Sequence, residues 1–225
     1  MEYQQVIPGR FIARPNRFIA HVETDCGVVV VHVKNTGRCR ELLLPGAAVY
    51  LEKAQNPARK TQYDLIAVEK GPLLINMDAQ APNKVFAEWA AQGGLPGLTL
   101  LRPETTWGRS RFDFYWESPM EKGFVEVKGV TLEKDGGAFF PDAPTLRGVK
   151  HLQELIAARQ AGYRTAVCFV IQMNDIRFFS PNDETHPEFG SALREAAAHG
   201  VDVWAYSCRV TPCSLVMDQP VPLRL

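Results

Sequence analysis

The sequence predicts a mixed α/β protein with two domains, a small β-barrel over residues 1–80 and an α/β domain over residues 81–225. Two observations carry this prediction. The first part contains about five short apolar stretches separated by turns, which is typical of a small barrel, and we expect the OB type. After Ala81-Pro82-Asn83 the pattern changes to helical and strand-like stretches in alternation, which indicates an α/β domain.

In the first part, each expected strand is an apolar run that meets turn residues. Pro15-Asn16 interrupts the run RFIARPNRFIAHVE, and GVVVVHVKN ends at the turn NTGR. The short apolar piece ELLLPG follows, and further strands are expected in AVYLEKA and YDLIAVEKGPLLINM.

In the second part, NKVFAEWAAQ has the apolar spacing of a helix, with Asn83 as its N-cap and Gly93-Gly94 at its end. Strands are then expected at 98–104, 109–116 and 124–132, followed by a long loop, a helix at 145–161, strands at 164–172 and 176–180, a helix at 188–199 and a strand at 201–207. The nearly continuous apolar run TAVCFVIQM predicts a central strand that is covered on both faces.

Composition limits the possible functions only in part. The formal net charge is +0, so any nucleic-acid surface has to be a local basic patch. The run GVVVV is too short to span a membrane, and the N-terminus lacks the features of a signal peptide, so we expect a cytoplasmic protein with no membrane partner. Five scattered cysteines without a CxxC pair favour reduced thiols over disulfides or a zinc site.

The stretch FVEVKGV places two charged residues inside an expected buried strand. Residues two apart in a strand project from the same face, so Glu126 and Lys128 share one side, opposite Val125 and Val127. If the strand pairs with RSRFDFYW so that Trp116 faces Gly123, Asp113 comes opposite Glu126. A slip of one residue in this register would separate the two carboxylates.

Two neighbouring carboxylates are suitable ligands for a hard divalent cation, and we expect Mg²⁺ or Mn²⁺ held by Asp113 and Glu126. Such a cation acidifies water and offsets charge on a phosphoryl oxygen, while Lys128 orients the nucleophile or stabilises the transition state. This pattern is therefore consistent with phosphodiester hydrolysis. The alternative is a structural ion pair between Glu126 and Lys128 on an edge strand.

The segment AFFPDAPTLRGVKHLQEL leads into the next expected helix, whose first turns carry Arg147, Lys150 and His151 off the apolar stripe. Each of these residues alone fits a solvated basic face. As a group beside a metal site, they are consistent with contacts to a phosphate backbone.

The motifs NTGRCRELLLPG, GRSRFDF, FVEVKGVTL and FFPDAPTLRGVKHLQEL resemble those of the sugar fermentation stimulation protein family of bacteria and archaea, over nearly the whole chain. The resemblance implies an OB barrel followed by a restriction-endonuclease-like PD-(D/E)xK domain. It also implies the catalytic set Asp113, Glu126 and Lys128, with Glu88 as the acidic residue of the first helix and Gln153 as an accessory residue. Glu104 is a second acidic candidate.

Family members are described as DNA-binding regulators of sugar utilisation and look like metal-dependent nucleases. We therefore expect a Mg²⁺- or Mn²⁺-dependent nuclease acting on DNA, with RNA as a second candidate substrate and a homodimer as a candidate assembly. The alternative is a DNA-binding regulator of sugar (maltose) utilisation without catalysis. The candidate nucleic-acid contacts are basic residues of the barrel and of the α/β domain: Arg14, Arg17, Lys34, Arg38, Arg40, Arg109, Arg111, Arg147 and Lys150.

Overall fold

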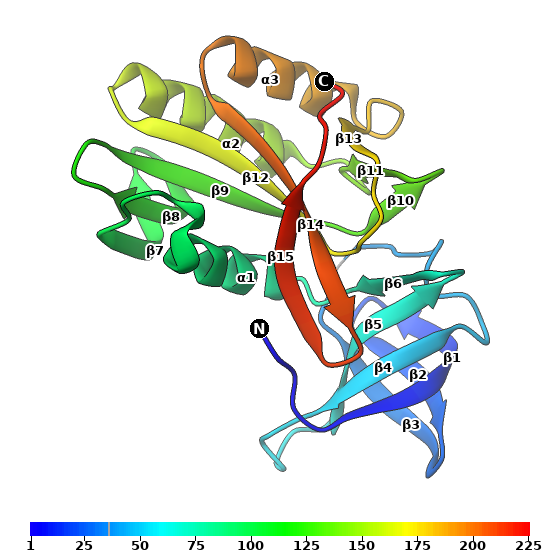
Figure 1. Cartoon of the computed structure of the whole chain (residues 1–225). Coiled ribbons are helices and arrows are strands. Elements are labelled where there is room, and N and C mark those ends of the chain that lie inside the picture. The colour runs from blue at the N-terminus through cyan, green and yellow to red at the C-terminus, as the bar shows by residue number, and fades with distance from the viewer. Residues whose placement is uncertain (36) are drawn as a thin grey trace.

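The computed structural model describes residues 1–35 and 37–225, and Figure 1 shows a barrel beside a larger α/β part. The barrel strands are β1 (Val6–Asn16), β2 (Ile19–Thr24), β3 (Gly27–Val33), β4 (Ala48–Lys53), β5 (Tyr63–Lys70) and β6 (Leu73–Asn76). The sheet order is β3-β2-β1-β4-β5-β6, and a parallel pairing of β3 with β5 closes it. The strands β1 to β5 thus form a closed barrel consistent with the OB type, as the sequence predicts.

Alternate residues of the barrel strands point into a dry core, which includes Val22, Val31 and Leu51. The segment ELLLPG forms no strand. The amides of Leu42 and Leu43 bond to the carbonyl oxygen of Cys39, and both side chains are buried in the same core. This apolar piece therefore contributes buried side chains from a turn.

The α/β part is built on a six-stranded sheet in the order β15-β14-β12-β9-β8-β7. Its strands are β7 (Leu100–Trp107), β8 (Ser110–Glu117), β9 (Lys122–Val130), β12 (Arg164–Ile171), β14 (Asp202–Thr211) and β15 (Ser214–Pro220). The three central strands β9, β12 and β14 are parallel, whereas β7 and β8 form an antiparallel extension of β9. A smaller sheet joins β10 (Leu132–Lys134), β11 (Gly137–Phe140) and β13 (Phe178–Pro181).

Helices cover both faces of the large sheet (Figure 1). One face packs on α1 (Ala81–Trp89), and the other on α2 (Leu146–Gln160) and α3 (Pro187–Ala198). The central strand β12 packs against helices on both faces of the sheet. Val167 and Phe169 belong to the apolar cluster that includes α2 and α3, and Cys168 belongs to the cluster of α1. The apolar run TAVCFVIQM is therefore a strand buried on both sides, as predicted.

The structure corrects several expected elements. The first helix begins at Ala81 after Gln80, so Asn83 is not its N-cap, and a π-helix follows over Ala90–Gly94. The expected long loop contains β10 and β11, and β15 was not predicted from the sequence. The strands β10 and β11 form a short hairpin, and β11 also pairs with the distant strand β13.

The barrel and the α/β part are joined through buried polar contacts. The backbone N–H of Asn76 donates to the carbonyl oxygen of Gln172, and the Gln172 side-chain amide donates to Asn76 Oδ1 at 2.8 Å. One apolar cluster also includes residues of both parts. The domain boundary near residue 81 stays a prediction. None of the helices in the described ranges has the length and apolar character needed to cross a membrane.

Candidate active site

Strand β9 presents the two charged residues of FVEVKGV toward helix α2. Val125 and Val127 are buried on the α1 face, so the alternation of the strand turns Glu126 and Lys128 to the opposite face, as predicted. The Lys128 Nζ lies 2.5 Å from Glu126 Oε1, and Glu126 is only 3% exposed. This pair lies in the interior of the sheet and not on an edge, since β9 lies between β8 and β12.

Asp113 joins this pair through the predicted hairpin register. Trp116 faces Gly123, and the pairing of β8 with β9 continues to Phe114 and Val125, where it stops. At this point the Asp113 carboxylate takes the place of a strand partner and accepts a hydrogen bond from the backbone N–H of Val127 at 2.8 Å. The aspartate therefore contacts the backbone of the Glu-x-Lys strand, and its role as a metal ligand stays a prediction.

Asn83 fixes the other oxygen of this carboxylate. Its side-chain amide donates to Asp113 Oδ1 at 3.0 Å from helix α1. Burial and the neighbouring Glu126 carboxylate raise the pKa of Asp113, while the bonds from Val127 and Asn83 act in the opposite direction.

His151 of helix α2 holds Glu126 from the opposite side. Its Nδ1 makes a short hydrogen bond to Glu126 Oε1, and its Nε2 faces Arg147 Nε at 3.3 Å. An arginine can only donate, so Nε2 is the acceptor and the proton is on Nδ1, which donates to the glutamate. The relay Arg147–His151–Glu126 therefore fixes one oxygen of the carboxylate.

The charges around Glu126 keep it ionised. Burial raises its pKa, but the hydrogen bond from His151 and the positive charge of Lys128 outweigh burial and lower the pKa below its ordinary value. Glu126 Oε2, by contrast, is buried and has no hydrogen-bond partner among the described residues. A buried carboxylate oxygen without a partner is costly, so this atom is suited to a ligand that the protein itself does not supply.

The unpartnered oxygen of Glu126 makes this group of residues suitable for binding a divalent cation. Asp113 and Glu126 offer ionisable oxygens whose mutual repulsion a cation would relieve. Within the described part of the chain, no three His, Cys, Asp or Glu side chains converge into a ready ligand cluster. Remaining ligands would therefore have to come from backbone carbonyls, water or a substrate phosphate.

Three other acidic or polar candidates lie elsewhere. Glu88 on α1 pairs with the amino group of Met1 at 2.5 Å. Gln153 is exposed, because it lies two residues beyond His151 and thus off the face that packs on β9. Glu104 is exposed, with Arg111 at 3.5 Å. The structure does not bring these three residues to the site, and on helix α2 it is His151 that contacts Glu126.

Two basic residues of the barrel are used internally. The Arg14 guanidinium donates to carbonyl oxygens of Asn35, Gly37 and Arg38 and so supports the loop after β3. Lys34 lies within 3.6 Å of Glu52, Asp64 and Asp78, an ion network inside the barrel. Lys34 is therefore a structural charge and not the expected nucleic-acid contact.

The other basic candidates remain on the surface. Arg17, Arg38 and Arg40 line an open hollow of about 430 Å³ together with Arg14. In the α/β part, Arg109, Arg111, Arg147 and Lys150 are exposed, and Lys150 Nζ donates to the carbonyl oxygen of Arg109 at 3.3 Å. The hairpin β7–β8 and the start of α2 thus carry a basic rim. Its role in nucleic-acid binding stays a prediction.

Sequence reasoning missed the roles of Asn83 and His151. Asn83 was assigned to a cap because it follows a proline and precedes a helical pattern, and its contact is with a residue 30 positions away. His151 lies off the apolar stripe, yet it is only 5% exposed. The sequence does contain one sign of the role of His151. It lies four residues after Arg147, on the same face of the helix that follows the Glu-x-Lys strand.

The closed five-stranded barrel and the sheet with an Asp and a Glu-x-Lys on neighbouring strands define a class of protein, an OB domain joined to a restriction-endonuclease-like domain. Two family models match accordingly: the SfsA N-terminal OB domain over residues 12–77, and the sugar fermentation stimulation protein RE domain over residues 80–214. The chain therefore belongs to the sugar fermentation stimulation protein family, and this family and its OB domain imply nucleic-acid binding.

Similar proteins extend over the full chain. Sugar fermentation stimulation protein homologs of Desulfitobacterium hafniense and Ruminiclostridium cellulolyticum are 54% and 51% identical, and each match covers 100% of this chain and at least 99% of the relative. Among solved structures, that of Pyrococcus furiosus SfsA in complex with Ca²⁺ is similar with a TM-score of 0.90 at 26% identity, covering 100% of this chain and 98% of that one.

Proposed function

We propose that this protein is a divalent-metal-dependent nuclease that hydrolyses phosphodiester bonds of DNA, with RNA as a second candidate substrate. The observation that carries the proposal is the buried Glu126 Oε2, which has no hydrogen-bond partner in the described part of the chain, on a side chain that pairs with Lys128 and whose charge acts on Asp113. The family's link to nucleic acid supports the substrate class. The solved relative in complex with Ca²⁺ supports a divalent cation, here Mg²⁺ or Mn²⁺.

Each residue has a separate task in this proposal. Asp113 and Glu126 would hold the cation, which would supply an acidified water and offset negative charge on the phosphoryl group. Lys128 donates toward the attacking water or the phosphoryl oxygen. His151 is a positioning residue, because its proton on Nδ1 fixes Glu126 Oε1 and leaves Oε2 for the cation. The basic rim from Arg109 to Lys150 contacts the phosphate backbone.

A second candidate is a DNA-binding regulator without catalysis. It is favoured by the name of the relatives, which refers to stimulation of sugar fermentation, and by the lack of a three-residue ligand cluster in the described ranges. A regulator gains nothing from two buried carboxylates close to where phosphates must approach, because they repel the polyanion.

The test is cleavage of plasmid and single-stranded DNA with Mg²⁺, with Mn²⁺ and with EDTA. We expect cleavage with either metal and none with EDTA, and a loss of at least about 100-fold in Glu126→Gln and Lys128→Ala. The matched controls are Glu184→Gln and Lys134→Ala, which change a similar Lys–Glu pair on the surface, at 2.9 Å. Both controls should cleave like the unchanged protein.

Three results would contradict the nuclease. Cleavage that persists in both site variants points to another source of activity. Binding of DNA without cleavage in any metal favours the regulator. Calcium titration by calorimetry gives a separate readout, since Glu126→Gln should lose cation binding whether or not cleavage occurs. Equal Ca²⁺ affinity in Glu126→Gln and in the unchanged protein would exclude this glutamate as a ligand.

A further inference from the structure

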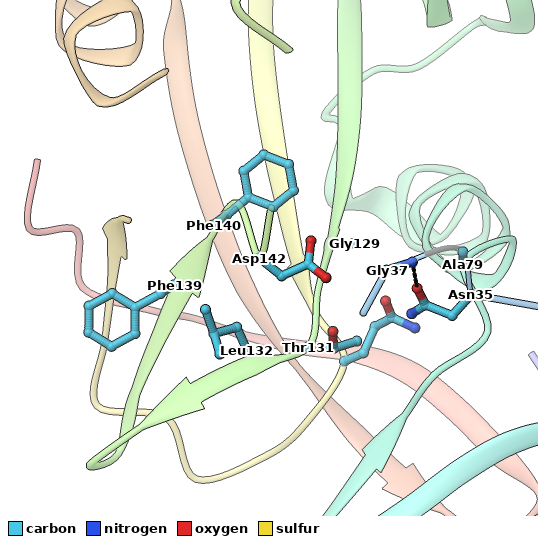
Figure 2. Close-up of a pocket in the computed structure, with 10 residues that line it drawn as sticks. Asn35, Gly37, Ala79, Gly129, Thr131, Leu132, Phe139, Phe140 and Asp142 are labelled. Atoms are coloured by element: carbon cyan, nitrogen blue, oxygen red, sulfur yellow. Dashed lines mark hydrogen bonds between the residues drawn. The ribbon is translucent and has the colours of Figure 1, made fainter. Parts of the chain in front are cut away.

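A small pocket lies between the barrel and the α/β part, at the end of strand β9 (Figure 2). Asn35 and Gly37 from the loop after β3 form one wall, and Gly129 and Thr131 from the end of β9 form another. Gly129 directly follows Lys128, and Thr131 lies two residues beyond Gly129, about 7 Å further along an extended chain. The pocket therefore lies where the end of the Glu-x-Lys strand meets the loop after β3 of the barrel.

The lining excludes a phosphate group as the occupant. None of the described residues that line the pocket is a lysine or arginine, and Asp142 is its one charged group. A carboxylate repels phosphate, so the part of a nucleic-acid strand that enters has to be uncharged, and N–H or O–H donors on it complement the carboxylate oxygens. Leu132, Phe139 and Phe140 add apolar surface. A nucleobase has both properties.

Two polar side chains that face the pocket have hydrogen-bonding atoms without a partner among the described residues. Among the described residues, the Asp142 carboxylate accepts no hydrogen bond, and the Asn35 side-chain nitrogen donates none. Asn35 Oδ1 accepts from the backbone N–H of Gly37 at 2.7 Å, and this bond fixes the amide so that its NH₂ remains as a donor. Figure 2 shows the Asp142 carboxylate and the Asn35 amide projecting from opposite sides toward the same space.

Two glycines keep these polar atoms in place. A Cβ on Gly37 would collide with the Asp142 carboxylate, and a Cβ on Gly129 would lie 2.6 Å from Gln172 Oε1. The amide of Gln172 is held by Asn76 Oδ1 and by the carbonyl oxygen of Asp78. The backbone on both sides thus approaches the pocket closely, and a side chain at either glycine would displace a lining polar group.

We infer that this pocket binds a guanine base of the nucleic-acid strand, an inference that rests on the proposed function. A carboxylate has acceptors only, and guanine offers two adjacent N–H donors at N1 and N2, which match its two oxygens. The Asn35 amide then donates to the guanine O6 atom. Adenine, cytosine and thymine each place an acceptor next to their donor on this edge, and the Asp142 carboxylate repels it.

The test uses fluorescein-labelled single-stranded thymine 12-mers that carry one central guanine, inosine, adenine or thymine. Binding is measured by fluorescence anisotropy with Ca²⁺ and with EDTA, after a gel has shown that the strands are intact. We expect guanine to bind about tenfold more tightly than thymine, as a bidentate base contact implies. Inosine, which lacks the 2-amino group, should be intermediate.

Asp142→Asn should remove the guanine preference and leave the affinity for the all-thymine strand unchanged. Asp175→Asn is the matched control, because it removes one exposed negative charge outside the pocket and should keep the preference. Equal binding of all four strands, or a guanine preference that survives in a folded Asp142→Asn, overturns the inference and leaves the proposed function standing. No binding of any strand also overturns the inference, and the cleavage test with plasmid DNA then decides the proposed function separately.

Discussion

Asp64 on strand β5 offers the clearest quantitative test of the barrel. Its carboxylate accepts hydrogen bonds from Arg59 at 2.6 and 3.0 Å and lies 3.3 Å from the Lys34 amine. Burial raises its pKa, but the bonds from Arg59, the charge of Lys34 and the bond from His32 outweigh burial and lower it to about 2 from 3.8. The perturbation that we propose is Asp64→Asn.

The magnitude follows from this shift. The folded pKa lies below the unfolded one, so the stabilisation is fully present above about pH 4 and is lost as the pH falls through about 2. A shift of this size corresponds to about 2.4 kcal/mol of unfolding free energy at pH 7 and about 1.3 kcal/mol at pH 3. Asp64→Asn should therefore cost about 2 kcal/mol at pH 7 and roughly half of that at pH 3.

The assay is urea unfolding at both pH values, followed by circular dichroism and by tryptophan fluorescence. The four tryptophans lie in the second part of the chain, while Asp64 lies in the barrel. One apolar cluster includes both parts, so the two probes should report one transition. Asp25→Asn, in an exposed turn of the barrel, is the control and should change little. A cost below about 0.5 kcal/mol at pH 7, or one that does not decrease at pH 3, would refute the reasoning.

Three further predictions concern the supports of the site. Thr145→Ala removes the hydrogen bond that the Thr145 hydroxyl accepts from the Gly148 N–H, and it should lower the free energy of unfolding, measured by chemical denaturation, by about 1 kcal/mol. Thr145→Ser keeps the hydroxyl and should retain most of that free energy. An equal loss in both variants would contradict a capping role. Asn83→Ala removes a hydrogen bond that lowers the pKa of Asp113. The pH below which Ca²⁺ binding is lost, measured by calorimetry, should therefore move to a higher value. An unchanged pH dependence would exclude a role of Asn83 in keeping Asp113 ionised. Gly123→Ala places a Cβ against a backbone carbonyl oxygen of β12. It should lower the free energy of unfolding by about 1–3 kcal/mol, measured as a lower midpoint of thermal unfolding. An unchanged midpoint would show that the two strands can separate at this position.

The hairpin around the site was predictable from the sequence because its determinants are local. The alternation in FVEVKGV fixes the face of Glu126 and Lys128, and a short connection to RSRFDFYW fixes the register at Trp116 and Gly123. The bonding of Asp113 was not predictable in detail. The strand pairing ends beside it, so its side chain bonds to a backbone amide of β9.

The residues that surround the site were less accessible to sequence reasoning. Lys34 has the same charge as Arg38, but it directly follows β3, the strand that closes the barrel, and it faces three carboxylates. Arg14 supports a loop through backbone carbonyls, a contact that charge counting does not detect. His151 reaches Glu126 because α2 packs over β9, and only that packing distinguishes it from the exposed Gln153.

The sequence by itself determined the change from a barrel to an α/β pattern, the buried central strand and the shared face of Glu126 and Lys128. These features depend on apolar periodicity and turn residues, which act over a few positions. Only the tertiary structure decided which charges meet. Contacts of Asn83 with Asp113, His151 with Glu126 and Lys34 with Asp64 join residues 25 to 30 positions apart, and they form only when packed helices and a closed barrel bring those positions together.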